Sequence, residues 1–232
     1  MVTRVVRSHP EKHAVLAALA VVAILALPAP ALAGPPLLCH PFDIGRAPSL
    51  LWDGSRAFWQ GKAGYQLANL VGDTHALSTP TTSVIVRMET LRRAALYASA
   101  DGEVAARLLF RLSERLRSSE RTGNPEPLAL FDFACLVETY RQIADLDRGL
   151  SEFRGRSAAL RKAVADTDGY ALATKVLTMR PGDRAIEFAA PLMTGHSNRW
   201  AYSTHVEKAR AGASRDALLM LPQRVYPGPL LR

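Results

Sequence analysis

The spacing of apolar residues beyond residue 80 is the feature that most constrains the fold of this 232-residue chain. Apolar side chains recur there every three or four positions, a repeat that places them on one face of an α-helix. The clearest example follows Asp101, where one helical face carries Val104, Ala105, Leu108, Leu109, Leu112 and Leu116. This periodicity predicts a mainly α-helical protein.

Residues that favour helix ends place the boundaries of these segments. Asp101 and Asp168 are suited to N-caps, because a carboxylate can accept hydrogen bonds from the free amides of a first turn. Pro127 is suited to the first turn of another helix, whose apolar stripe turns Cys135 inward. Further helices are expected from Val84 and at 151–165, 169–179, 184–190, 199–211 and after Ser214. Their short connections favour an antiparallel helical bundle or a short stack of helical hairpins.

Proline and glycine punctuate residues 34–79 and exclude long helices there. Short helices remain compatible with the pattern, one opening at Pro48 and one over 63–71. The segment is rich in aromatic side chains, namely Trp52, Phe58, Trp59 and Tyr65. We expect a loop-rich N-terminal arm at 34–79 that packs these rings on a helical domain at 80–221; an exposed aromatic binding surface is the alternative. Residues 222–232 are expected to form an extended tail.

Residues 1–33 have the pattern of a cleavable secretory signal. Three basic residues precede an unbroken apolar run of 14 residues at 14–27. Such a run fits a signal peptide, whereas a membrane-spanning helix needs roughly 18 or more apolar residues. Two prolines and the small residues at 31–33 follow, so we expect cleavage before Gly34. The pattern predicts export to the periplasm or beyond, with an uncleaved N-terminal anchor as the alternative.

The chain has two cysteines, Cys39 and Cys135. In an oxidising compartment a disulfide between them is the default expectation. It would close a loop of nearly 100 residues and contribute on the order of 4 to 5 kcal/mol by the chain-entropy model. We therefore predict that this disulfide joins the arm to the helical domain.

Basic residues outnumber acidic residues even after the signal is removed, by 26 to 20. Arg107, Arg111 and Arg115 recur every four residues on the helix expected after Asp101. Other arginines lie near them in the sequence, namely Arg87, Arg92, Arg93, Arg117 and Arg121. Like charges at this spacing repel slightly, which favours compensation by acidic neighbours or by an anionic ligand. The two interpretations are a solvated helix face and an anion-binding face.

Four residues make a possible polar site, namely His40, Asp43, Asp73 and His75. A carboxylate beside an imidazole is the pairing used in acid-base and nucleophilic catalysis. Cys39 also lies beside His40, but adjacent side chains in an extended chain point to opposite sides. No spacing typical of a metal site, cofactor site or phosphate-binding loop occurs in the sequence. We therefore expect no metal and no cofactor.

These features favour an exported helical protein that binds an unknown protein or envelope component in the bacterial cell envelope, and not nucleic acid. Two alternatives stay open: an exported hydrolase or metal-dependent enzyme built on His and Asp side chains, and binding of an anionic lipid or polysaccharide through the arginines. The stretch 170–190 resembles the end of one tetratricopeptide repeat, but no 34-residue repeat can be aligned along the chain. That likeness transfers no function, and no transmembrane segment is expected after cleavage.

Overall fold

The computed structural model describes residues 38, 41–53, 59–146, 153, 155–194, 204, 205 and 208. The predicted signal at 1–33, the tail at 222–232 and most of the helix expected at 199–211 lie outside these residues, as does Phe58. The described part is mainly helical, as predicted, and is compatible with a helical bundle. It holds no strand, only an isolated antiparallel bridge between Trp52 and Gly61.

Seven α-helices and a short 3-10 helix follow one another along the described part of the chain. They are η2 (Leu67–Asn69), α2 (Leu70–Leu77), α3 (Val84–Ala98), α4 (Gly102–Arg121), α5 (Pro127–Leu146), α6 (Ser157–Ala163), α7 (Gly169–Met179) and α8 (Arg184–Thr194). None of them is long and apolar enough to cross a membrane.

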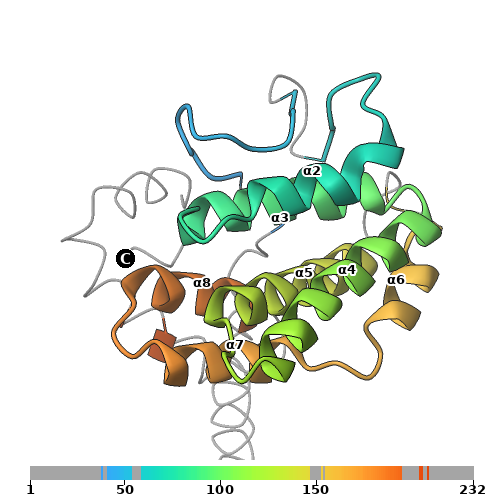
Figure 1. Ribbon diagram of the computed structural model, residues 1–232. Coiled ribbons are helices and arrows are strands. Elements are labelled where there is room, and N and C mark those ends of the chain that lie inside the picture. Colours follow the sequence, from blue (N-terminus) through green and yellow to red (C-terminus); the bar gives the residue numbers. More distant parts are fainter. Residues whose placement is uncertain are drawn as a thin grey trace, which may run out of the picture. The chain divides into compact units, whose positions relative to one another are not determined.

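Helix α5 lies at the centre of the packing and contacts α3, α4, α6, α7 and α8. Figure 1 shows α2 and α3 on one side of it, with the arm segment around 41–53 beyond α3. Helix α3 is therefore covered from both sides, and every residue in it except Arg93 is buried. One hydrophobic core joins the arm, through Leu38, Phe42 and Leu50, to the helices.

Buried charged side chains of α3 bind the backbone of the arm. Glu89 accepts a hydrogen bond from the Phe42 N–H at 3.0 Å, and it also pairs with Arg92 and Arg93. Arg93 in turn donates to the Leu50 carbonyl at 2.7 Å. A carboxylate removed from water needs such partners, because an unpaired buried charge is strongly destabilising. The ion-paired group of Glu89, Arg92 and Arg93 therefore links the burial of α3 to the docking of the arm.

Aromatic rings hold further described residues of the arm against α3. The Tyr97 hydroxyl donates to the Leu51 carbonyl at 2.6 Å and accepts from the Lys62 N–H at 2.8 Å. The Trp52 ring meets the Tyr97 ring edge-on at 5.5 Å and lies under the Arg92 guanidinium. Trp52, Trp59 and Tyr65 are all partly buried against the core. The prediction that the described aromatic residues of the arm pack on the helical body is therefore confirmed.

Three predicted helix starts agree with the structure. Helix α4 begins after Asp101, whose carboxylate accepts from the amides of Glu103 and Val104. Helix α7 begins after Asp168, which accepts from the Ala171 amide at 3.0 Å. Helix α5 begins at Pro127. Each of these starts depends on residues within one turn of the helix, so the local sequence suffices to predict it.

Other boundaries differ from the prediction. No helix opens at Pro48, because the carbonyls of the following residues are bound by side chains of α3 instead of by their own turn. The helix expected at 63–71 is displaced to α2, after a turn in which Gly64 has a φ of 78°. Helix α6 begins at Ser157, later than predicted, and α8 continues through Pro191 beyond the expected end at 190.

Cys135 is a free thiol and is fully buried. The described residues contain no disulfide, so the predicted bond to Cys39 is not seen; Cys39 itself lies outside the described residues. Burial raises the pKa of the Cys135 thiol well above its ordinary value, and the nearby Asp132 adds to the rise. A thiol in such surroundings behaves as a small apolar side chain.

Candidate anion-binding site

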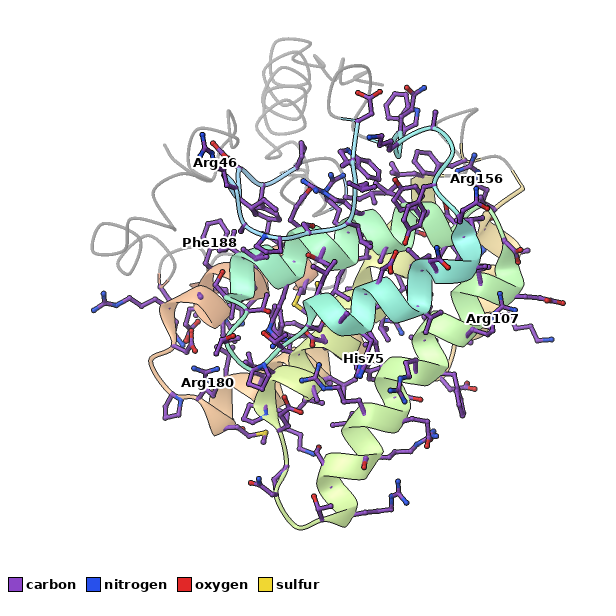
Figure 2. All side chains as sticks on the ribbon, turned by 45° about the horizontal axis from the view of Figure 1, so that its top comes forward. Arg46, His75, Arg107, Arg156, Arg180 and Phe188 are labelled. Atoms are coloured by element: carbon purple, nitrogen blue, oxygen red, sulfur yellow. The ribbon has the colours of Figure 1, made fainter. Side chains whose placement is uncertain are left out.

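A pocket of about 470 Å³ lies between α2, α4 and the segment that leads into α5. It is lined by His75, Arg111, Glu114, Arg115, Ser118, Ser119, Arg121, Thr122 and Glu126. Figure 2 shows His75 between the ribbons of α2 and α4. The pocket thus combines three arginines and a histidine with hydroxyl groups and two carboxylates.

The helical repeat of α4 explains why these residues share one face. Arg111, Arg115 and Ser118 are three or four residues apart, so they follow one another along the helix. The adjacent face carries the buried Leu108 and Leu112, which pack in the core. On α2, His75 lies in the last turn, where it meets the middle of α4. The amphipathic pattern therefore places the polar face of α4 against the end of α2.

Most charges at this pocket are already neutralised within the protein. Arg115 donates from Nε to Glu126 at 3.2 Å, pairs with the same carboxylate through Nη2, and reaches Asp132 at 3.2 Å. Glu114 pairs with Arg117 at 2.8 Å. Arg111 and Arg121 have no carboxylate partner among the described residues. Two positive charges therefore remain uncompensated in the pocket.

The imidazole of His75 faces one of these charges. Its Nε2 lies 3.3 Å from Arg111 Nη2, close enough for the guanidinium to donate to a neutral imidazole. Desolvation lowers the pKa of His75, and the positive charges of Arg111 and Arg115 lower it further. Its position between cations thus favours the neutral form of the His75 imidazole.

A buried ion cluster supports the pocket from behind. Arg87 of α3 donates to Asp132 Oδ2 of α5 at 2.5 Å, and the same oxygen accepts from Arg115 of α4. Desolvation raises the pKa of Asp132 to about 6, and the two arginines limit that rise. Its other oxygen, Oδ1, is buried and has no hydrogen-bond partner among the described residues. The cluster fixes Arg115 and so fixes the floor of the pocket.

The structure separates the arginines that the sequence placed together. Arg111 and Arg115 line the pocket, but Arg107 lies outside it and pairs loosely with Glu103 at 3.8 Å (Figure 2). Arg87 and Arg92 are buried in ion pairs and do not contribute to any surface. Arg121, which the sequence analysis names only among the arginines near these three, also lines the pocket. Its position in the last turn of α4 places it there.

The residues of the predicted polar site do not converge among the described residues. Asp73 accepts from the Tyr65 hydroxyl at 2.7 Å, whereas His75 contacts Arg111. Asp43 is exposed and accepts from the Gly45 amide within its own turn. His40 lies outside the described residues. No group of three or more metal-binding side chains occurs in the described part of the chain.

A second polar cluster connects α7 and α8 with residues near 205. His205 Nε2 lies 3.1 Å from the Tyr170 hydroxyl, and its Nδ1 lies 3.2 Å from Glu187. Lys208 also reaches Glu187, at 3.6 Å. The bonded pairs are 18 to 35 positions apart in the chain, and no local pattern links them, so sequence reasoning missed the cluster. Its hydrogen bonds join His205 to α7 and α8.

Comparison of the sequence with protein-family models and curated proteins, and of the structure with solved structures, gave no match.

Proposed function

We propose that the protein is an exported binding module of the bacterial cell envelope, and that the pocket between α2 and α4 takes an anionic group of its ligand. The proposal rests on one observation above all: Arg111 and Arg121 line a single pocket without a carboxylate partner in the described structure. The signal pattern at 1–33 supports export.

The dimensions of the pocket indicate an elongated ligand. Arg111 and Arg121 are ten residues apart, which corresponds to about 15 Å along the axis of α4. Glu114 lies between them in the sequence and Glu126 follows Arg121, and both carboxylates are already paired with arginines. A ligand with two anionic groups separated by a similar distance matches this arrangement. Sulfated or phosphorylated polysaccharides and anionic lipid headgroups carry the required chemistry.

Binding measurements with charge-matched variants test the proposal. Titration calorimetry with sulfated dextran is expected to give a salt-sensitive affinity, because the interaction releases counterions. Arg111→Gln and Arg121→Gln are each expected to weaken it about five- to tenfold, the loss of one charge-assisted contact. Arg107→Gln is the matched control, since it removes the same charge from the same helix outside the pocket. Co-sedimentation with anionic vesicles separates lipid from polysaccharide.

Equal weakening by all three substitutions would mean that net charge alone drives binding and would overturn the proposed site. Binding that does not respond to salt would contradict an ionic contact. Vesicle binding that depends on Arg111, with no binding of sulfated dextran, would assign the pocket to lipid headgroups.

A further inference from the structure

At one end of the pocket the guanidinium of Arg111, which is always charged, lies beside the imidazole of His75, which can gain a proton. The end at Arg121 has no such imidazole among its lining residues. The His75 ring is exposed on the pocket side, and Arg111 is exposed beside it. A proton on Nε2 would set two donors 3.3 Å apart, the Nε2–H of His75 and Arg111 Nη2, and an anion that accepts from both would relieve their repulsion. The two groups would then present two positive charges and several N–H donors to one ligand.

We infer that this end of the pocket binds a phosphate group as its dianion, together with one proton taken up by His75. The inference rests on the proposed function and specifies the ligand of that site. A dianion matches the combined charge of Arg111 and protonated His75, whereas a carboxylate would neutralise only one of them. Free phosphate, a sugar phosphate and a phosphomonoester lipid headgroup share this chemistry.

Groups on every neighbouring element set the charge around His75. From α4 it faces Arg111 and Arg115, and Glu114 is paired with Arg117. From the segment before α5 comes Glu126, whose carboxylate is bound by Arg115. On α2 itself Asp73 bonds to Tyr65, and from α3 Arg87 is paired with buried Asp132. The net field at the imidazole is therefore positive.

Linkage then couples the ligand to the proton. In the free protein the positive field and desolvation lower the pKa of His75. A bound dianion reverses that field and raises the pKa, so the complex holds a proton that the free protein lacks. Affinity must therefore increase as the pH falls, by about tenfold for each unit of pKa difference between the two states.

Inorganic sulfate is the probe that isolates His75, because it stays a dianion throughout the pH range, whereas a phosphate monoester itself gains a proton near pH 6. Titration calorimetry of the full chain between pH 5.5 and pH 8 is expected to show about tenfold tighter sulfate binding at the acidic end. The binding enthalpy should also vary with the ionisation enthalpy of the buffer, which measures proton uptake without any variant. His75→Gln is expected to abolish both effects, while Arg107→Gln retains them.

The outcomes separate this inference from the proposed function. A pH-independent sulfate affinity that is still lost in Arg111→Gln would overturn the proton coupling and leave the anion site standing. Equal sulfate binding by Arg111→Gln and Arg107→Gln would overturn the site itself. Inorganic phosphate, a sugar phosphate and phosphatidic acid vesicles, compared at pH 7, then identify the source of the phosphate group by the tightest binding.

Discussion

The carboxylate of Glu89 in α3 lies 3.0 Å from the backbone nitrogen of Phe42 in the arm, 47 residues earlier in the chain. The same carboxylate binds Arg92 at 2.8 Å and Arg93 at 2.6 Å, and its side chain is completely buried. One acidic residue therefore pairs with two arginines of α3 and anchors the arm on that helix.

Glu89→Gln is expected to destabilise the protein by about 3 to 5 kcal/mol, because it leaves the buried Arg92 charge without its partner. Urea unfolding followed by circular dichroism measures this change. Glu120→Gln is the matched control, since its pair with Lys175 is exposed and 3.8 Å long. That substitution should shift the free energy of unfolding by less than about 1 kcal/mol. Equal stability of the two variants would contradict the anchoring role of Glu89.

Two helical glycines are expected to respond in opposite directions to alanine. A Cβ at Gly169 would lie 2.5 Å from Glu138 Oε1 and 3.0 Å from the Ala134 carbonyl, so α7 would have to move away from α5. Gly169→Ala should cost about 1 to 3 kcal/mol. A Cβ at Gly72 in α2 meets nothing within 4 Å, and Gly72→Ala should stabilise by about 0.5 to 1 kcal/mol. Thermal unfolding of both variants tests the contrast, and shifts of the same sign would refute it.

Glu138 gives stability a measurable pH dependence. Desolvation raises its pKa to about 7 from an ordinary value of 4.5, although Arg141 and the amides of Gly169 and Tyr170 oppose the rise. Because the folded pKa is the higher one, its contribution is complete below pH 4.5 and is lost as the pH rises through 7. Glu138→Gln should therefore gain about 3 kcal/mol relative to wild type between pH 4.5 and pH 8. Urea unfolding of the two proteins at several pH values measures this change. A difference in the free energy of unfolding that stays constant between pH 4.5 and pH 8 would contradict it.

The Cys135 thiol is expected to be unreactive in the folded protein, because it is fully buried and its pKa is raised. In a Cys39→Ser variant, a thiol-specific reagent should modify no cysteine under native conditions and one cysteine in denaturant. Rapid native modification would show that α5 is not packed as described. Mass spectrometry of the wild-type chain without reductant tests the Cys39–Cys135 disulfide directly, through a loss of two hydrogens.

How far the fold can be predicted depends on the sequence distance over which each contact acts. The caps at Asp101 and Asp168 act within three residues, so they were predicted from the local pattern. The partner of Arg87 is Asp132, 45 residues away, and no periodicity indicates that pairing. Arg87 and Arg92 therefore resembled surface arginines, although both are buried.

The candidate site was predictable only in part for the same reason. The four-residue spacing puts Arg111 and Arg115 on one face of α4, and both line the pocket. His75 belongs to another helix, and the sequence grouped it with Asp73 because the two are neighbours on α2. In the structure these side chains contact different partners, Arg111 and Tyr65. Spacing along one helix shows which of its residues share a face. Tertiary packing decides which other helix lies against that face, and the spacing does not reveal it.

The hydrogen bond from the Leu38 amide to Gln142 spans 104 residues and sets an order of events during synthesis. A ribosome completes the arm long before it completes α5, and a chain that crosses a membrane from its N-terminus would deliver the two in the same order. The hydrogen bond of Leu38 therefore cannot form until α5 has been made, whereas the hydrogen bonds of Phe42 and Leu50 need only α3. A segment made early is thus completed by a contact with a residue made more than a hundred positions later.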